Sequence, residues 1–153
     1  MSITHILVVC VGNICRSPMA EALLGDALTG PEEITVESAG LGALVGHPAD
    51  KHAVELMKER GVDITAHRAR QLHPDMVATA DLILVMETAH KISIDTAEPT
   101  ARGKIHRLCE WQDKDIDDPY RQPKAAFADA LKDIEDGVAD WVERLTQRDG
   151  KKQ

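Results

Sequence analysis

The chain has 153 residues, 43% of them hydrophobic, which is enough to bury the core of one globular domain. Its formal charge of −8 argues against a nucleic-acid partner, and any anionic substrate must be attracted by a local group of donors. The longest apolar run, residues 6–11, is too short to cross a bilayer, and the three cysteines are too few for a disulfide scaffold. We therefore expect a cytoplasmic monomer.

Predicted strands and helices alternate along the chain. The expected strands cover residues 3–9, 34–38, 81–86 and 104–108. The expected helices cover residues 19–28 and 50–60, a short helix from residue 74, another from residue 87, and a last helix with an apolar stripe from 127 to 145. Ser17 and Pro18 match an N-cap and the first helical position, and Gly61 matches a C-cap.

This alternation predicts an α/β fold, with a parallel sheet covered by helices on both faces. No linker or repeat divides the chain, so residues 1–153 are expected to form one domain with frayed final residues. Ligands of such sheets bind at the carboxyl ends of the strands, which is where Cys10 falls.

The turn between the first strand and the first helix reads C-V-G-N-I-C-R-S, from Cys10 to Ser17. Backbone N–H groups of such a turn can form an anion-binding nest, to which the helix N-terminus adds positive potential. Gly12 tolerates the left-handed angles that a nest requires, and Asn13 is the next most tolerant residue type. Arg16 offers a planar fork to two phosphate oxygens.

A thiolate at Cys10 beside this phosphate cradle predicts covalent catalysis through a phosphocysteine, without a metal or other cofactor. A hydroxyl from Ser17 would hydrogen-bond the sulfur and ease its departure. Two plainer interpretations compete. A cysteine that ends an apolar strand is often a core residue, and a Gly-Asn turn is often only a turn. The combination with Arg16 favours chemistry.

The best candidate for a general acid is Asp118, in the segment D-D-P-Y that ends at Tyr120. An acid that protonates the leaving phenol would accelerate dephosphorylation, and Pro119 biases Asp118 toward an extended conformation in a loop. A solvated acidic turn explains the same residues equally well. Tyr120 is expected to line the entrance and to stack on a phenyl ring.

Together, these motifs resemble the low-molecular-weight protein tyrosine phosphatases. Cys10 to Ser17 is similar to the family's C-x5-R-S phosphate loop, and Asp118-Pro119-Tyr120 to its D-P-Y element, which carries the general acid. The resemblance spans nearly the whole chain and implies a three-layer fold with a four-stranded parallel sheet. It selects Asp118 over the solvated turn, and it implies that the backbone of Val11, Gly12, Asn13, Ile14 and Cys15 binds phosphate.

The resemblance also implies a network beneath the loop. Asn13, Ser17, Ser38 and His67 resemble residues that hydrogen-bond together and hold Asn13 in a strained conformation. In this family, the pair equivalent to Cys10 and Cys15 forms a reversible disulfide that protects the nucleophile. Without the resemblance, His67 would be interpreted as an ordinary histidine and Cys15 as filling space. Cys109 is expected to be a packing residue.

The predicted substrate is phosphotyrosine. Leu44 is expected opposite Tyr120, where many eukaryotic members place an aromatic residue, so the chain instead resembles the bacterial branch linked to capsule and exopolysaccharide export. That branch dephosphorylates the tyrosine-rich tail of a membrane-bound autokinase. Related phosphoarginine phosphatases tend to have Thr where this chain has Ile14, which favours phosphotyrosine over phosphoarginine.

Two other functions fit parts of the pattern. Thioredoxin-coupled arsenate reductases share the fold and the loop, but they need further cysteines, and only Cys109 lies outside the loop. A non-catalytic phosphate-binding module would need neither the thiol nor the acid. A metal site is not predicted, because the seven histidines show no ligand spacing such as H-E-x-x-H.

Overall fold

A four-stranded, wholly parallel sheet forms the centre of the computed structural model, which describes residues 3–30 and 33–151, with side chains up to residue 146. The strands are β1 (His5–Cys10), β2 (Thr35–Gly40), β3 (Leu82–Val85) and β4 (Ile105–Arg107). Their order in the sheet is β2-β1-β3-β4, so β1 is central and its carboxyl end is flanked by those of β2 and β3. The predicted parallel sheet is confirmed.

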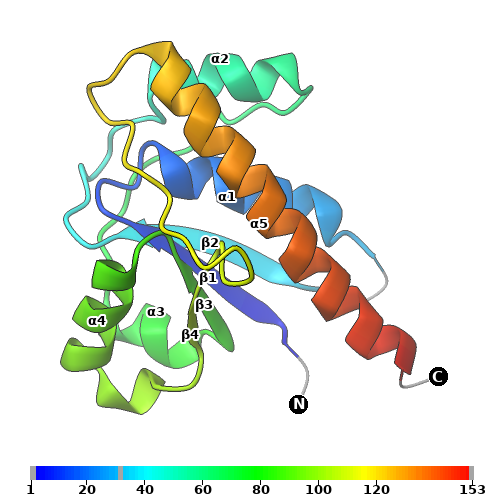
Figure 1. Ribbon diagram of the computed structural model, residues 1–153. Coiled ribbons are helices and arrows are strands. Elements are labelled where there is room, and N and C mark those ends of the chain that lie inside the picture. The colour runs from blue at the N-terminus through cyan, green and yellow to red at the C-terminus, as the bar shows by residue number, and fades with distance from the viewer. Residues whose placement is uncertain (1–2, 31–32, 152–153) are drawn as a thin grey trace.

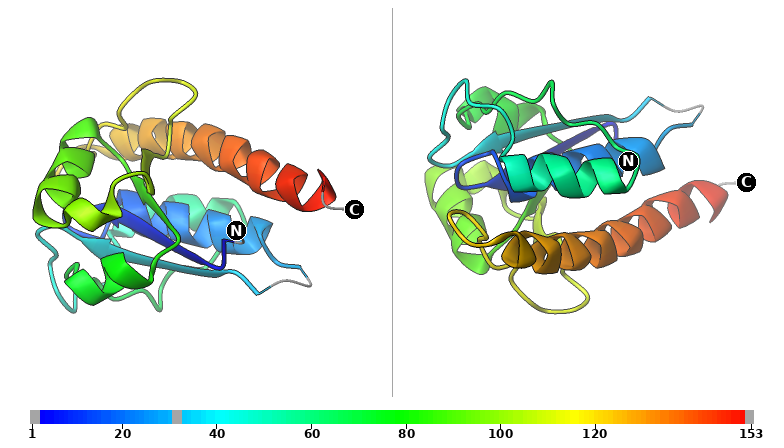
Figure 2. Two further views of the ribbon diagram at one scale, coloured as in Figure 1. Left: turned by 90° about the horizontal axis from the view of Figure 1, so that it is seen from below. Right: turned by 90° about the horizontal axis from the view of Figure 1, so that it is seen from above.

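Helices cover both faces of this sheet (Figures 1 and 2). One face carries α1 (Arg16–Ala27), α2 (Lys51–Glu59) and the long α5 (Lys124–Lys151). The other face carries α3 (Pro74–Thr79), α4 (Thr88–Ala97) and a short 3-10 helix (Pro99–Ala101). The three-layer arrangement agrees with the prediction.

The alternation of side chains along β1 divides the core into two clusters. Ile6, Val8 and Cys10 point toward α1, α2 and α5, whereas Leu7 and Val9 point toward α3 and α4. All five residues are at most 2% exposed, as expected for the central strand of a parallel sheet. The strand thus delivers Cys10 to the carboxyl edge of the sheet, beside the first turn of α1.

The sequence predicted the C-terminal end of α2 better than the N-terminal end of α1. Arg60 is the C-cap of α2, and Gly61 follows it with φ of 77°, so the glycine predicted at this helix end adopts the left-handed conformation one residue after the cap. The predicted N-cap at Ser17 is wrong, because α1 already begins at Arg16 and Cys15 occupies the cap position without a capping side chain. The Ser17 hydroxyl is engaged with Cys10 and Asn13 instead, so side-chain contacts outweigh the capping preference here.

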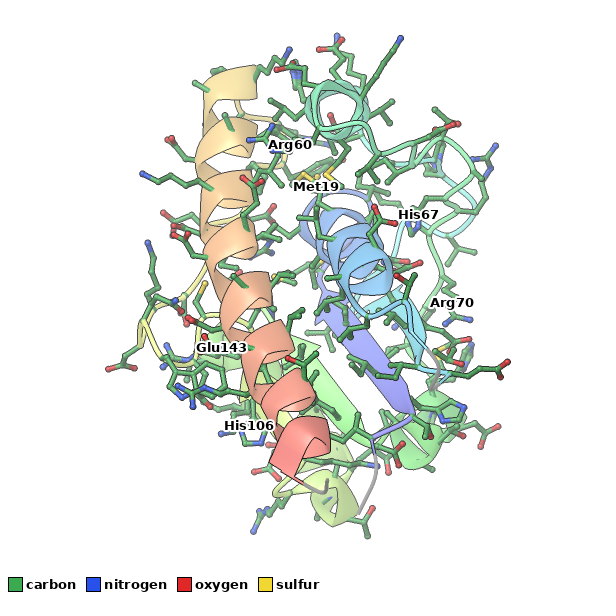
Figure 3. The ribbon with its side chains drawn as sticks, turned by 90° about the vertical axis from the view of Figure 1, so that its right-hand side faces the viewer. Met19, Arg60, His67, Arg70, His106 and Glu143 are labelled. Atoms are coloured by element: carbon green, nitrogen blue, oxygen red, sulfur yellow. The ribbon has the colours of Figure 1, made fainter. Side chains whose placement is uncertain are left out.

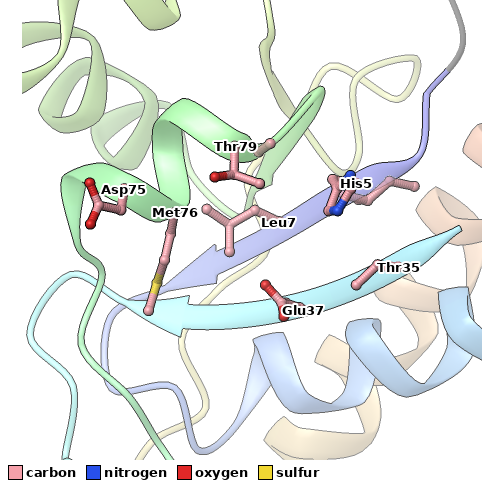
Figure 4. A pocket seen from close by; sticks show the side chains of 9 residues that line it. His5, Leu7, Thr35, Glu37, Asp75, Met76 and Thr79 are labelled. Carbon is pink, nitrogen blue, oxygen red and sulfur yellow. The ribbon is translucent and has the colours of Figure 1, made fainter.

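A cavity of about 190 Å³ lies where α3 packs over the edge of the sheet (Figure 4). Its walls include Leu7 and Met76 together with the polar side chains of His5, Glu37 and Asp75. None of the residues from Cys10 to Ser17 lines it. In the ranges 3–30 and 33–151, no helix combines the length and the apolar character that a membrane span requires.

Gly137 and Gly25 provide a test of how tightly the helical layer packs. A Cβ at Gly137 in α5 would lie 2.8 Å from the carbonyl oxygen of Leu108, whereas one at Gly25 in α1 would meet nothing within 4 Å. We expect Gly137→Ala to lower the free energy of unfolding by about 1–3 kcal/mol through overpacking, although alanine favours a helix. Gly25→Ala should raise it by about 0.5–1 kcal/mol, because alanine is the better helix former.

Urea unfolding of both variants and of the wild type measures these two changes. Opposite signs are the expected result. A Gly137→Ala variant that is as stable as Gly25→Ala would show that α5 does not press on the segment after β4.

Candidate active site

The segment that joins β1 to α1 is anchored to the rest of the protein through its carbonyl groups. Each carbonyl from residue 10 to residue 14 accepts a hydrogen bond from outside the segment. The donors, in that order, are the backbone amides of Leu41, Gly42 and Leu44, the imidazole of His67 and the backbone amide of Asp50, at 2.7–3.1 Å. The loop between β2 and α2, residues 41–50, supplies four of these five donors, so it acts as a frame for the segment.

The amides of the same segment have no such partners. Among the described residues, no carbonyl or side chain accepts a hydrogen bond from the backbone N–H groups of residues 11–15. Asn13, Ile14 and Cys15 are at most 7% exposed. Buried N–H groups need a hydrogen-bond acceptor. These N–H groups are therefore available to donate to a bound anion.

Asn13 carries the backbone strain of the segment. Its φ is 60°, in the left-handed region, whereas Gly12 is absent from the residues with positive φ. The expectation that Gly12 supplies the left-handed angle is therefore wrong, and the tolerance of asparagine for this region is what is used. A Cβ at Gly12 would approach Ile14 and Leu44 at 3.7–4.0 Å, which is ordinary contact.

Hydrogen bonds hold Asn13 from several directions. Its amide nitrogen donates to Ser17 at 2.8 Å and to Ser38 at 2.9 Å, and its side-chain oxygen accepts from the backbone amide of Arg70 at 2.9 Å. His67 donates from Nε2 to the Asn13 carbonyl at 2.7 Å. The structure therefore brings together all four residues that the resemblance placed in this network. Figure 3 shows His67 and Arg70 on the segment that follows α2.

Two members of the network were not predicted. Glu21 of α1 accepts the Ser38 hydroxyl hydrogen, and Arg70 donates from Nε to the Ser38 carbonyl at 2.9 Å while pairing with Glu37 at 3.1 Å. Glu21 was noticed only as a residue of the first helical turn. Arg70 lies three residues after His67, which is the only sequence signal that could have indicated it.

The Cys10 sulfur lies at the base of this segment, 2.9 Å from the Ser17 hydroxyl oxygen. Because that oxygen already accepts from Asn13, the hydroxyl hydrogen is available to donate to the sulfur. Cys10 is only 2% exposed, yet it lines a cavity of about 110 Å³ that opens at the edge of the sheet. The sulfur is thus within reach of a bound group.

The three cysteines are free thiols in the structure, with different surroundings. Burial, and then the charge of Asp50, raise the pKa of the Cys15 thiol, so this group stays protonated. Burial, and then the charge of Asp133, raise the pKa of Cys109 to about 11. Its sulfur donates to the Asp133 carbonyl at 3.2 Å, which agrees with the expected packing role.

Arg16 is 1% exposed and connects three segments. Its NH1 group donates to the Glu87 carboxylate and to the Ile116 carbonyl, both at 2.6 Å, and its NH2 group lies 3.6 Å from an oxygen of Asp118. Its Nε has no acceptor among the described residues. The protein therefore fixes NH1 and leaves a buried donor for an anion in the cavity.

Glu87 was not identified from the sequence. It lies two residues after β3, so its position at a carboxyl strand end was the available signal. Its side chain is 30% exposed, and the oxygen that accepts from Arg16 lies 3.3 Å from Nε2 of His90 in α4.

Asp118 lines the same cavity as Cys10 and Arg16. It follows a segment whose Ile116 amide donates to the Met86 carbonyl at 2.9 Å. One of its oxygens accepts from the backbone amide of Tyr120 at 3.0 Å, which closes an Asx-type turn. The other oxygen faces Arg16. The side chain is 42% exposed, so it can exchange protons with solvent.

The rest of the cavity wall is largely apolar or aromatic. Val11, Gly12, Ile14, Leu44 and Tyr120 all line it, together with Cys15 and Gly42. The Arg121 guanidinium lies 5.2 Å from the centre of the Tyr120 ring, at a distance suited to a cation–π contact. An anionic head beside the amides and a planar apolar group against this wall would together fill the site. No group of three or more His, Cys, Asp or Glu in the described part of the chain could hold a metal ion.

Comparison with known proteins matches the chain to one family. The family model for low molecular weight phosphotyrosine protein phosphatase matches residues 5–152. A probable low molecular weight protein-tyrosine-phosphatase EpsP of Ralstonia solanacearum is 54% identical over 143 residues, covering 94% of this chain and 97% of that protein.

Solved structures agree. The Vibrio vulnificus Wzb in complex with benzylphosphonate superimposes with a TM-score of 0.88 at 43% identity, covering 94% of this chain and all of that one. The YwlE arginine phosphatase of Geobacillus stearothermophilus gives 0.91 at 33% identity, covering 98% and 97%. On this sequence match and shared fold, the chain belongs to the low molecular weight protein-tyrosine-phosphatase family, as its phosphate-loop motif predicted.

Proposed function

We propose that this phosphatase hydrolyses phosphotyrosine through a phosphocysteine formed on Cys10. The observation that carries the proposal is the arrangement of the segment from Cys10 to Cys15. Neighbouring elements bind the carbonyls of residues 10–14, whereas the backbone N–H groups of residues 11–15 have no acceptor among the described residues. The Cys10 sulfur lies at the base of the same segment. A phosphate dianion supplies the oxygen acceptors that these amides need. A phosphorus atom held there would lie above the nucleophile, which is the positioning that phosphoryl transfer requires.

In the first step, the Cys10 thiolate attacks phosphorus and the bond from phosphorus to the phenolic oxygen breaks. Asp118 gives its proton to that oxygen, so tyrosine leaves as a neutral phenol. The amides of residues 11–15 and the free Nε of Arg16 stabilise the charge that develops on the phosphoryl oxygens. Ser17 donates to the sulfur and makes it a better leaving group in the next step.

In the second step, a water molecule attacks the phosphocysteine. Asp118, now ionised, accepts the water proton, in keeping with its reverse role in the first step. The bond from phosphorus to sulfur breaks, inorganic phosphate forms and the Cys10 thiolate returns. The exposure of Asp118 to solvent supports both proton transfers.

The cavity wall supports an aromatic substrate. Leu44, Val11 and Tyr120 provide an apolar and aromatic surface beside the phosphate loop. The similar Wzb of Vibrio vulnificus was solved with benzylphosphonate, whose benzyl group and phosphonate resemble the side chain of phosphotyrosine. We assign the physiological substrate to the phosphotyrosines of a bacterial autokinase of polysaccharide export, supported by relatives that carry the names EpsP and Wzb. A cytoplasmic location accords with three free thiols and with a kinase as substrate.

The similarity to an arginine phosphatase favours phosphoarginine as a second candidate substrate. Ile14 lines the cavity in this chain, and its aliphatic side chain cannot hydrogen-bond the additional N–H groups of a guanidinium. Phosphotyrosine therefore remains the better match.

The proposed roles of Cys10 and Asp118 can be tested by substitution. Cys10→Ser should abolish hydrolysis of aryl phosphates. Asp118→Ala should lower kcat for a phosphotyrosine peptide by about 100-fold or more, because the poor leaving group needs a proton. The loss on p-nitrophenyl phosphate should be much smaller. Steady-state kinetics on both substrates measures the difference.

The neighbouring Asp117 provides a matched control for the acid. It is exposed, and Asp117→Ala should leave the ratio of the two rates near that of the wild type. An equal loss on both substrates in Asp118→Ala, or full activity in Cys10→Ser, would contradict the mechanism.

Ile14 should determine the preference for phosphotyrosine over phosphoarginine. We expect the wild type to cleave an aryl phosphate far faster than phosphoarginine, and Ile14→Thr to narrow the ratio of kcat/KM values by about tenfold, the effect of one additional hydrogen bond. Parallel assays of phosphate release from phosphotyrosine and phosphoarginine peptides provide the measurement. Comparable wild-type rates on the two substrates would refute the assignment.

A further inference from the structure

His90 is a buried histidine in the first turn of α4, outside the cavity wall. It is 5% exposed, and its Nε2 lies 3.3 Å from the Glu87 oxygen that accepts from Arg16 at 2.6 Å. Its Nδ1 has no partner among the described side chains and backbone groups. Among the described residues, the imidazole therefore has one close polar contact, and that contact is with the carboxylate that binds Arg16.

The protonation state of His90 follows from its surroundings. Burial, and then the positive charge of Arg16, lower the pKa of His90, although Glu87, Asp115 and Asp118 oppose this effect. The ring is therefore neutral near pH 7. Nε2 faces the Glu87 carboxylate, which only accepts hydrogen bonds, so we expect the single ring hydrogen on Nε2.

The Glu87 carboxylate needs a restraint if it is to stay paired with Arg16. Glu87 is the residue just before α4, and its side chain is 30% exposed. The carboxylate can therefore turn toward water. A close polar contact with a neutral imidazole, at 3.3 Å, restrains the carboxylate without adding positive charge. Because the imidazole is neutral, Arg16 remains the positively charged partner of Glu87, and their salt bridge is kept.

We propose that His90 is a positioning residue that holds Glu87 against Arg16 and so orients the guanidinium for phosphate. Glu87 and Ile116 fix NH1, and the guanidinium is planar, so the N–H bond of the free Nε has a fixed orientation. If the Glu87 carboxylate turns away, NH1 loses one of its two acceptors and the guanidinium can rotate. A small rotation displaces the donors from the phosphoryl oxygens, to which catalysis is sensitive.

The inference rests on the proposed role of Arg16 in phosphate binding. The test compares His90→Gln with His90→Met, because these side chains have nearly the same shape and only the first has a donor. We expect His90→Met to raise the inhibition constant for inorganic phosphate, and to lower kcat/KM for p-nitrophenyl phosphate, by about tenfold, as removal of an outer hydrogen-bond partner does in other sites. His90→Gln should stay within about threefold of the wild type.

His52 offers a matched control. Its Nδ1 also has no partner among the described residues, and its ring packs on Phe127 at 5.1 Å in another part of the protein. His52→Met should change the melting temperature without changing phosphate inhibition. If His90→Met and His52→Met behave alike, lowering stability and leaving phosphate inhibition unchanged, His90 has only a structural role and the inference is refuted.

A double-substitution cycle tests whether the effect passes through Glu87. In a Glu87→Ala background, His90→Met should cause no further loss, whereas an additive loss would show that His90 acts independently. If neither His90 variant folds, nitrogen NMR of the wild-type imidazole decides the question. Hydrogen on Nε2 and a resonance that moves on addition of phosphate support the proposal, and hydrogen on Nδ1 overturns it.

Failure of the proposed function would look different. In that case, the wild type would neither hydrolyse p-nitrophenyl phosphate nor be inhibited by phosphate. Failure of the present inference would leave an active, phosphate-inhibited wild type whose His90→Met variant matches it.

Discussion

The active site depends on how the hydrogen bonds of one short segment are divided between the protein and a ligand. Every carbonyl from Cys10 to Ile14 is bound by a neighbouring element, whereas the N–H groups of residues 11–15 have no acceptor in the part of the chain that the structure describes. This division requires the left-handed turn at Asn13, which costs of order 1–3 kcal/mol unless the surroundings enforce it. The hydrogen bonds from His67 and Arg70 provide that enforcement, so residues more than fifty positions away determine the shape of the loop.

Arg16 couples this loop to the rest of the catalytic edge. Through NH1 it contacts Glu87, which follows β3, and the Ile116 carbonyl, two residues before Asp118. The same side chain therefore connects the Cys10–Cys15 segment, the start of α4 and the segment that carries Asp118. A net charge of −8 makes this concentration of donors necessary, since the average field of the protein repels a dianion.

The sequence predicted the parts of the molecule whose signals are local. The continuous apolar character of residues 6–9 identified the central strand, and the spacing from Cys10 to Arg16 identified the loop. Two predictions made from neighbouring residues alone were wrong: the N-cap of α1 and the residue with the left-handed angle. Serine is a typical N-cap residue, but the Ser17 hydroxyl accepts from Asn13 instead. Gly12 could adopt a left-handed angle, but Asn13 is the residue that does.

What could not be predicted depends on contacts between distant residues. Glu87 and His90 matter because the parallel order β2-β1-β3 brings the end of β3 beside Arg16, and single-sequence patterns contain no information about that pairing. Arg70 reaches Ser38 for a similar reason, after a loop that crosses the carboxyl edge. The resemblance to a family supplied Ser38 and His67, which the residues alone would not have indicated.

The preformed amide cradle has a consequence for the end of the reaction cycle. A socket that is already shaped before the substrate arrives does not distinguish a phosphoryl group attached to tyrosine from free orthophosphate. Under the proposed mechanism, the released phosphate would leave from the same donors that bind the substrate, and free phosphate would compete with every phosphoprotein for the empty site. In the proposed mechanism, discrimination would come from the wall formed by Val11, Leu44 and Tyr120, which a phenyl ring can contact and free phosphate cannot.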